Sequence, residues 1–406
     1  MVKTDQHVVI VGAGPAGAVL GYILAARGMR VTLLEGCADF NRDFRGDTLH
    51  ASSLEILDQL GLAEQLLPMC HGRIEKLGFQ TENNELTIAD FRLLNSRFNC
   101  VELIPQERFL GFMVEQASRF ANFKCIMNAR VHALQFQGEK VSGVEYHLNN
   151  EKMTLNADLV IGADGRGSAV RREAGLELMK TAPPMDILWF RLPRDREHHS
   201  ADAVTAHFGK GGAMLIRLAR DDEWQLGYVL IKGSYKQLRE QGLQAFQDQI
   251  KAMQPELENV ISNLDDWSKC AILSVVCGRV KRWYRAGLLL IGDAAHIMSP
   301  IGGVGINYAI QDAVAAANVL VTAINSGSVT ENDLQQVQVR REMPVKFIQK
   351  IQGMIQNNVI ANALKSDKPF QPPLPLRILA RTNSFRKFMA KILAYGLKPE
   401  KLQLID

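Results

Sequence analysis

Residues 8–17 decide the fold of this 406-residue chain, and they read Val8-Val9-Ile10-Val11-Gly12-Ala13-Gly14-Pro15-Ala16-Gly17. The four leading apolar residues predict a buried strand, and the apolar stretch that follows Gly17 predicts a helix. Between strand and helix stands the spacing G-x-G-x-x-G. Its first glycine permits a tight turn, its second lets the backbone approach a pyrophosphate, and its third lets helix and strand pack closely. Because these glycines interrupt the apolar run, we interpret it as strand, turn and helix rather than a membrane span.

The next residues complete a βαβ unit. Gly28 is placed to stop the helix, and Arg30 to Glu35 read as a second strand. A glutamate at the end of that strand can accept hydrogen bonds from both hydroxyls of an adenosine ribose, and it disfavours a 2′-phosphate. The sequence therefore predicts that the ADP part of a dinucleotide lies on Gly12, Ala13, Gly14, Pro15, Ala16, Gly17 and Glu35. This motif alone does not distinguish NAD from FAD.

A second glycine turn in the C-terminal half favours FAD. Leu288 to Ile291 read as a buried strand that runs into Gly292 and Asp293. A carboxylate would repel phosphates, so Asp293 is better suited to accept hydrogen bonds from a ribityl chain, which NAD lacks. Soon afterwards a second glycine-rich turn opens another helix, whose amides can face the flavin pyrimidine ring. The expected flavin contacts in this turn are Pro300, Gly302, Gly303, Val304, Gly305, Ile306 and Asn307; the alternative is a glycine-rich helix entry without a ligand.

A third segment, residues 157–168, also runs from a strand into a turn. Asp164 and Gly165 follow the strand, Ser168 is placed to cap a short helix, and Arg171 lies one turn further on. Asp164 is a candidate cofactor neighbour, and the alternative is that it orders the turn. Arg171 is expected to reach a carboxylate or phosphate.

The remaining periodicity indicates a second domain. Residues 76–100 and 177–280 alternate as in a mostly antiparallel sheet, and residues 306–406 are mainly helical. Ser52 to Glu55 carry the pattern of a capping box at a helix start. We predict a mixed α/β fold with a Rossmann-like, three-layer ββα domain for FAD (residues 1–75, 101–176 and 281–345). A substrate domain (76–100 and 177–280) and a C-terminal helical segment (346–406) complete the prediction.

Composition excludes several other classes of protein. The chain is 47% hydrophobic and carries a formal charge of +4 without a long basic run, so a nucleic-acid partner is not expected. Its six cysteines lack metal-ligand spacing, so no metal and no disulfide are predicted. No other long apolar run is uninterrupted, and we expect a soluble, cytoplasmic protein. The basic tail, Arg381 to Lys401, is expected to be a solvated amphipathic helix, with weak contact to membrane lipid or a partner as the alternative.

The three glycine and aspartate segments, in this order and at these separations, resemble the group A flavoprotein monooxygenases, which have the para-hydroxybenzoate hydroxylase fold. The resemblance covers most of the chain. It implies that Arg45 and Gln106 approach FAD from the side, although either can instead be a solvated loop residue, and that Val131 contacts adenine through its backbone. Two departures stand out: Gly303-Val304-Gly305 replaces the Gly-Gln-Gly of many relatives, and the thioredoxin-like domain of phenol hydroxylases is missing.

The resemblance also implies a reaction. NADPH or NADH binds transiently and reduces FAD, oxygen adds at the flavin C4a atom, and the hydroperoxide hydroxylates or epoxidises a hydrophobic small molecule that is expected to be aromatic. The substrate is expected between the flavin and the alternating sheet. Trp189 and Arg191 share one face of a strand there, and the alternative is a core tryptophan and a surface arginine. No residue is assigned as a catalytic acid, base or nucleophile, and His296 is expected to be structural.

Two other functions stay open at this point. One is a reductase or dehydrogenase of the same fold, similar to geranylgeranyl reductases, which passes hydride to an alkene. The other is a non-catalytic FAD-binding redox module. Product formation that depends on oxygen separates the first from a monooxygenase, and failure of NADH and NADPH to bleach the flavin indicates the second.

Overall fold

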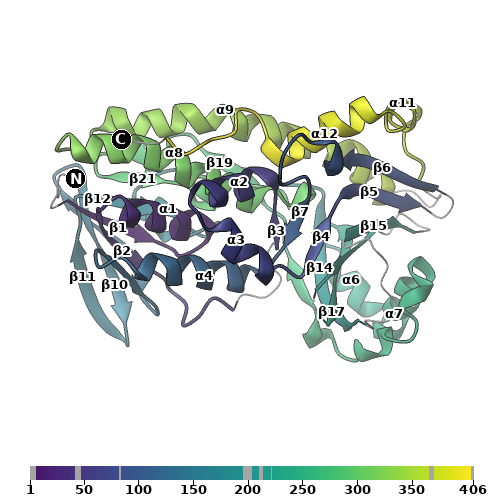
Figure 1. The fold of residues 1–406 in the computed structure, drawn as a ribbon. Coiled ribbons are helices and arrows are strands. Elements are labelled where there is room, and N and C mark those ends of the chain that lie inside the picture. Colours follow the sequence, from purple (N-terminus) through teal and green to yellow (C-terminus); the bar gives the residue numbers. More distant parts are fainter. Residues whose placement is uncertain are drawn as a thin grey trace.

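The computed structural model describes residues 6–41, 47–81, 84–194, 204–209, 214–220, 222–364 and 370–403. One half of the molecule is built on a six-stranded sheet with the order β20-β21-β12-β1-β2-β8 (Figure 1). All neighbouring strands in it are parallel except β20, which is antiparallel to β21. The strands are β1 (His7–Val11), β2 (Arg30–Leu34), β8 (Phe123–Ile126), β12 (Leu159–Gly162), β20 (Tyr284–Arg285) and β21 (Leu288–Leu290).

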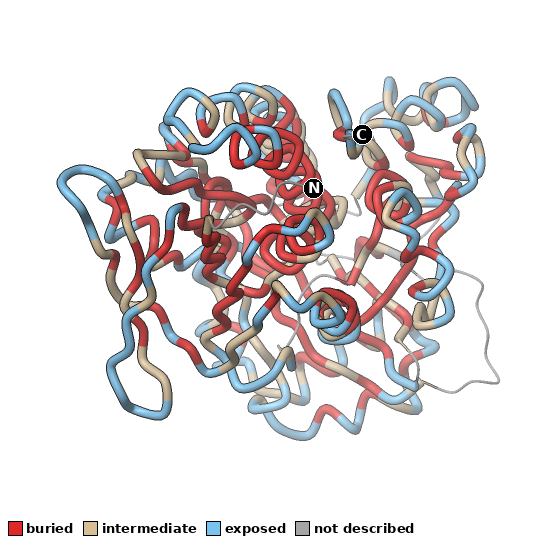
Figure 2. The backbone as a smooth tube through the Cα atoms, turned by 60° about the vertical axis from the view of Figure 1, so that its left-hand side comes forward, coloured by how far each residue is buried: buried red, intermediate tan, exposed pale blue. Residues whose placement is uncertain are grey.

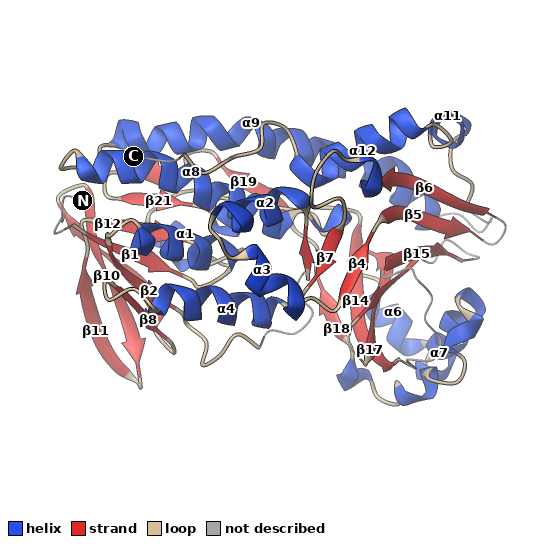
Figure 3. Ribbon diagram, in the orientation of Figure 1, coloured by secondary structure: helices blue, strands red, loops and turns tan. Residues whose placement is uncertain are grey.

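Both faces of this sheet are buried. Val8 and Ile10 of β1 belong to the core beneath the helices, whereas Val9 and Val11 belong to the core on the other face. The helices on the first face are α1 (Pro15–Ala26), α4 (Gln106–Ser118) and α8 (Gly305–Asn325). The second face is covered by an antiparallel sheet of β9 (Arg130–Gln137), β10 (Lys140–Leu148) and β11 (Glu151–Asn156), seen at the lower left of Figure 3. The predicted three-layer arrangement is confirmed.

The other half of the molecule holds a seven-stranded, mostly antiparallel sheet with the order β18-β14-β17-β16-β15-β5-β6. Leu188 and Phe190 of β14 pack on one face with helices α6 (Tyr235–Glu240) and α7 (Leu243–Met253), whereas Ile187 and Trp189 face the opposite way. Figure 2 shows that the buried residues line the interior of both halves. The strands are β5 (Lys76–Thr81), β6 (Asn84–Asp90), β14 (Met185–Pro193), β15 (Val204–Phe208), β16 (Met214–Ala219), β17 (Glu223–Ile231) and β18 (Ala271–Leu273).

Smaller elements join the halves. Two three-stranded sheets are formed by β3 (Thr48–Leu49), β7 (Val101–Leu103) and β4 (Gly72–Ile74), and by β13 (Leu178–Thr181), β19 (Cys277–Val280) and β22 (His296–Ile297). The remaining α-helices are α2 (Ala51–Gln59), α3 (Ala63–Leu66), α5 (Ala169–Glu173), α9 (Glu331–Ile355), α10 (Ala361–Leu364), α11 (Leu374–Leu379) and α12 (Asn383–Tyr395). Residues 301–325 are apolar and long enough to cross a membrane, but 83% of the apolar window is buried in the protein, as in a core helix.

One predicted helix cap and one predicted domain boundary differ from the helices of the structure, and one predicted site residue is not described by it. The capping box at Ser52 to Glu55 is wrong: α2 begins at Ala51 without a side-chain cap, so Ser52 lies inside the helix, where its hydroxyl accepts a hydrogen bond from the distant Gln311 (3.4 Å). The proposed domain boundary at residue 346 falls inside α9 and therefore does not coincide with the end of an element. This helix accommodates Pro344 and continues unbroken to Ile355. Arg45 lies outside the described residues.

Candidate cofactor site

In the first glycine turn, the protein's own packing requires glycine at some positions but not at others. Gly12 has φ of 99°, and a Cβ there would lie 2.5 Å from the carbonyl oxygen of Ala163. A Cβ on Gly17 would overlap the carbonyl oxygen of Gly12, so close packing of helix and strand requires glycine at both positions. Gly14, by contrast, has extended backbone, and its Cβ would meet only the Ala163 oxygen at 3.9 Å. The protein itself therefore does not require glycine at position 14, which suits the approach of a ligand.

The helix that follows this turn leaves its first amides available. Gly14 is the N-cap of α1, no side chain caps the helix, and its first turn holds no acidic residue. Amides at such a helix start attract phosphate. The buried Glu35 accepts hydrogen bonds from the backbone N–H of Ala13 (2.9 Å) and of Cys37 (3.1 Å), which fixes the carboxylate beside the turn. Its contact with a ribose stays a prediction.

The second glycine turn lies against the first. A Cβ on Gly292 would be 3.2 Å from the Cβ of Ala16 and 3.4 Å from that of Ala309. Gly292 is thus enclosed between the first turn of α1 and the second turn of α8, although it is far from α1 in sequence. One extended molecule can therefore contact both turns.

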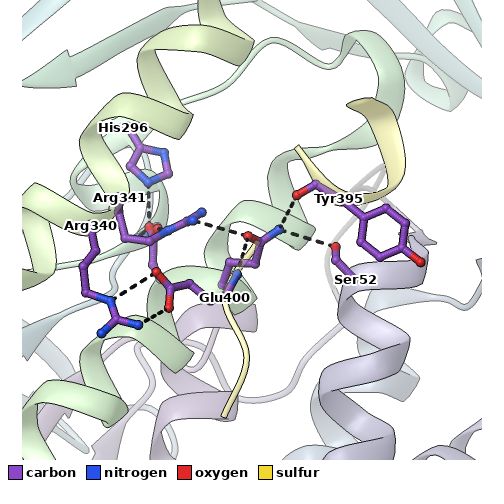
Figure 4. Close-up of polar contacts among 9 residues, drawn as sticks. Ser52, His296, Arg340, Arg341, Tyr395 and Glu400 are labelled. Carbon is purple, nitrogen blue, oxygen red and sulfur yellow. Dashed lines mark hydrogen bonds and ion pairs between the residues drawn. The ribbon is translucent and has the colours of Figure 1, made fainter. Parts of the chain in front are cut away.

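A buried ionic network holds this second turn in place (Figure 4). Asp312 on α8 accepts hydrogen bonds from the Gly292 N–H (2.9 Å), from His296 Nε2 (2.6 Å) and from Arg341 Nε (2.8 Å), and all three side chains are buried. Burial by itself would raise the pKa of Asp312, but the contacts with His296 and Arg341 outweigh it and hold this pKa below its ordinary value. His296 therefore has a structural partner, as expected.

Hydrogen bonds connect the glycine-rich loop and the start of α8 to β3 and to the residues that follow it. The Asn307 side-chain oxygen accepts from the His50 N–H (2.8 Å) and from the Ser53 hydroxyl (2.6 Å), and the Thr48 hydroxyl donates to the Gly303 oxygen (2.8 Å). Gly303 has φ of 61°, and a Cβ there would lie 2.6 Å from the Thr48 hydroxyl oxygen. The α8 helix start has no side-chain cap and no acidic residue in its first turn. Its amides are available to a ligand.

The remaining positions of the loop lie where the sequence places them. Pro300, Ile301, Gly302 and Gly303 form a 3-10 turn, Val304 is the N-cap of α8, and Gly305 and Ile306 begin the helix. A Cβ on Gly305 would meet only the Met298 Cβ at 3.9 Å, so the space beside it is open. These positions remain predicted flavin contacts.

Hydrogen bonds within the third segment, residues 157–168 and the start of the following helix, stabilise its turn. Asp164 accepts hydrogen bonds from the Ser168 hydroxyl (2.5 Å) and the Val170 N–H (3.1 Å), so it stabilises the turn and the start of α5. Burial raises the pKa of Asp164. Its backbone adjoins Gly12, since a Cβ on Gly12 would lie 2.7 Å from the Asp164 Cα. The Arg171 guanidinium donates to the carbonyl oxygens of Ala294 and Arg166, and it thereby stabilises the second glycine turn, whereas its contact with a phosphate stays a prediction.

Two further positions are placed near these turns. Val131, on β9, packs in the same core as Val11 and Leu34, the ends of β1 and β2. Gln106 begins α4, and its N–H donates to the Asp47 carboxylate (3.4 Å). Both stay predicted contacts of the cofactor.

Asp47 also links the two halves of the molecule. Its carboxylate lies 3.1 Å from Arg220 Nε, beyond the end of β16, and both side chains are largely buried. Burial raises the pKa of Asp47 to about 6, although Arg220 opposes this shift. Burial therefore disfavours the ionised form of the Asp47 carboxylate.

We expect the stability of the protein to depend on pH through Asp47. Because its pKa in the folded protein lies above the ordinary 3.8, the folded state binds the proton more tightly between these values. The free energy of unfolding should fall by about 1 to 3 kcal/mol relative to Asp47→Asn as pH rises from 4 through 6. Urea unfolding of both proteins across this range measures the difference, and a difference that does not change with pH would contradict the assignment.

Taken together, the turns form a continuous cradle of uncapped helix starts and close backbone, with a partly exposed carboxylate, Asp293, on the second turn. That combination fits FAD, which needs phosphate donors at one end and a ribityl acceptor at the other. The sequence matches the family described as "FAD binding domain" over residues 5–346. The chain belongs to this family. The predicted FAD cofactor, the predicted fold and the resemblance to group A flavoprotein monooxygenases are thereby confirmed.

Comparison with individual proteins shows how far the similarity extends. The chain is 33% identical over 394 residues to 6-methylpretetramide 4-monooxygenase from Streptomyces rimosus, covering 96% of this chain and 92% of that protein. It is 27% identical over 361 residues to digeranylgeranylglycerophospholipid reductase 2 from Methanopyrus kandleri, covering 83% and 82%. Among solved structures, p-nitrophenol 4-monooxygenase from Pseudomonas putida DLL-E4 superimposes with a TM-score of 0.79 at 21% identity, covering 97% of each chain, which shows the shared fold.

Substitution of Asp293 tests the ribityl end of the FAD site. We expect Asp293→Ala to weaken FAD binding by about 1.5 to 3 kcal/mol, the usual scale for loss of a hydrogen bond to a charged group. Flavin fluorescence titration of the apoprotein measures the affinity. Asp265→Ala, at an exposed position before β18, is the control and should bind FAD like the wild type. Equal affinity in both variants would remove Asp293 from the site.

Proposed function

We propose that this protein is an FAD-dependent monooxygenase that uses NADPH or NADH and O2 to hydroxylate or epoxidise a hydrophobic, aromatic small molecule. The observation that carries the proposal is the contact between the turns at Ala16 and Gly292, which offers one site to the whole length of FAD. Family membership and the 33% identity with 6-methylpretetramide 4-monooxygenase support the same activity. We further propose that the protein acts in the cytoplasm and has no nucleic-acid partner.

FAD supplies the redox chemistry, and the chain supplies binding, orientation and exclusion of water. The uncapped amides at the start of α1 stabilise negative charge on the phosphates, and those at the start of α8 stabilise negative charge on the ring system. The network around Asp312 keeps the second turn rigid. No side chain of the described residues is required as a nucleophile.

The substrate site is proposed on the inner face of the seven-stranded sheet. Trp189 lies there in a core that also includes Ile301 of the glycine-rich loop, so this face is turned toward the cofactor loop. A Cβ on Gly227 would lie 2.8 Å from the Trp189 ring, which therefore rests flat across the neighbouring strand. Glycine at position 227 makes room for that orientation.

Two buried polar atoms on this face have no hydrogen-bond partner in the described part of the chain. They are the indole nitrogen of Trp189 and the side-chain oxygen of Gln225, whose neighbour across the strands is Arg191. Arg191 itself lies 3.8 Å from the Glu223 carboxylate. A donor and an acceptor that are buried without partners favour a substrate with both hydroxyl and carbonyl groups, as on an aromatic polyketide.

The indole N–H can be tested separately from the ring. We expect Trp189→Phe to raise KM for a hydroxylated aromatic substrate about 5- to 20-fold, the cost of one buried hydrogen bond, with kcat changed less than KM. Steady-state NADPH oxidation coupled to product analysis gives both constants. Trp267→Phe, on the far side of the sheet with α6 and α7, is the matched control. An unchanged KM in Trp189→Phe would place the substrate elsewhere.

The most direct test of the function is reduction followed by air. The purified yellow protein is mixed anaerobically with NADPH or NADH in the presence of phenols, polyketides and indoles, and air is then admitted. Bleaching of the flavin followed by an oxygenated product, labelled from ¹⁸O2, is the expected result. An alkene reduced without oxygen would instead support the reductase, consistent with the 27% identical relative. No bleaching with any substrate would indicate a non-catalytic module.

A further inference from the structure

The C-terminal helices present large apolar side chains to solvent. On α11, Leu374 and Ile378 are one turn apart and are 64% and 57% exposed. On α12, Phe388 is 58% exposed, and it shares a helix face with the exposed Ser384, Lys387 and Lys391, because these residues follow a spacing of three and four. Clustered exposed apolar side chains of this size mark surfaces of interaction.

The same segment is strongly basic. Residues 370–399 contain no aspartate or glutamate. They contain six basic residues, namely Arg377, Arg381, Arg386, Lys387, Lys391 and Lys398. Among these, Arg381, Lys387 and Lys391 are exposed beside the apolar side chains. Such a surface fits a partner that is both apolar and negatively charged.

Helix α9 repeats the pattern along the same edge of the molecule. Its exposed residues Val339, Met343, Lys346, Lys350 and Met354 follow helical spacing and form one stripe. Figure 1 shows α9, α12 and α11 in succession along the upper edge of the molecule, with α12 packed on β6 at the end of the seven-stranded sheet. Exposed apolar and lysine side chains therefore also lie along α9, where Lys346 pairs with Glu342 (2.8 Å).

We propose that this edge, formed by α11 and α12 and flanked by the stripe on α9, docks on the surface of a lipid bilayer that carries anionic headgroups. Apolar side chains enter the boundary between headgroups and acyl chains, while the adjacent lysine and arginine side chains reach the phosphates. A second copy of the chain is a poor occupant, because two acid-free basic segments would face each other across a symmetric interface. Docking would bring the enzyme to apolar molecules dissolved in the membrane.

Vesicle binding tests this proposal without any measurement of activity. FAD-loaded protein is sedimented with vesicles of phosphatidylcholine alone or of phosphatidylcholine mixed with phosphatidylglycerol. We expect binding to the mixed vesicles only, decreasing as salt is raised. Lys387→Glu combined with Lys391→Glu should weaken it about tenfold or more, and Ile378→Ser combined with Phe388→Ser should weaken it without altering its salt dependence.

The control is Lys124→Glu combined with Lys236→Glu, two exposed lysines on β8 and α6. It makes the same change in net charge and should bind vesicles like the wild type, and bound flavin and thermal midpoint show that every variant is folded. Equal loss in control and test variants, or equal binding to neutral vesicles, would overturn the proposal. So would a concentration-dependent dimer that Phe388→Ser abolishes, since the surface would then be an interface between copies.

Discussion

The Asp312→Ala variant is expected to lose about 3 to 5 kcal/mol of unfolding free energy and to bind FAD poorly. Its carboxylate is the only acceptor found for Arg341 Nε and His296 Nε2 among the described residues, and both side chains are buried. Removing it leaves a guanidinium charge without its counterion in the core, which is far more costly than the net value of the pair. The Gly292 N–H loses its acceptor as well, so the turn beside Ala16 loosens.

Urea unfolding and flavin titration measure the two effects separately. Glu342→Ala is the matched control, because Glu342 forms an ion pair with Lys346 at the surface of α9 (2.8 Å) and should cost less than about 1 kcal/mol. The double variant Asp312→Ala with Arg341→Leu should regain part of the stability, since it no longer buries an unpaired charge. If Asp312→Ala and Glu342→Ala were equally stable, the network would have no structural role.

The Gly14→Val variant is expected to fold normally and to bind FAD at least about 100-fold more weakly, which corresponds to about 2.7 kcal/mol. Position 14 has an extended backbone that any residue adopts. The nearest atom that a Cβ there would meet is the Ala163 oxygen, 3.9 Å away. The added side chain instead occupies the space in which a pyrophosphate approaches the helix start. The loss should therefore fall on binding alone.

Valine substitutions at two other glycines serve as comparisons for this result. Gly12→Val should fail to fold, because its φ of 99° and the overlap with Ala163 reject any side chain. Gly111→Val, in α4, meets no atom within 4 Å and should retain both fold and flavin. Thermal melting of the apoproteins and flavin titration distinguish the three. Normal FAD affinity in Gly14→Val would falsify the placement of the phosphates.

Local features of the sequence were sufficient to predict the turns and most of the strands. The glycines from Gly12 to Gly17 and the apolar runs around them specify a conformation that depends little on distant residues, and the alternation along β14, β16 and β17 predicted antiparallel strands that the structure has. The contacts of these elements with the cofactor stay predictions.

Long-range polar contacts could not be predicted in the same way. Ser52 has the spacing of a helix cap, but it lies inside α2, and its hydroxyl accepts a hydrogen bond from Gln311, more than 250 residues away in sequence. Arg171 has the position of a phosphate ligand, yet its guanidinium also donates to the carbonyl oxygen of Ala294 in the second glycine turn and to that of Arg166 in its own segment. One signal was available for Asp312: it is the only acidic residue in the helix Gly305–Asn325, and a lone carboxylate in a buried helix requires a partner.

The contact of Gly292 with Ala16 also has a consequence for biosynthesis. When residues 6–41 leave the ribosome, they can form the strand and helix of the predicted ADP site, but the turn and the helix that complete the cradle belong to residues 288–325. A nascent chain that ends before this region presents half of a binding surface. Uptake of the flavin is therefore a late event that follows synthesis of residues 288–325, and it requires that these residues have packed against residues 6–41.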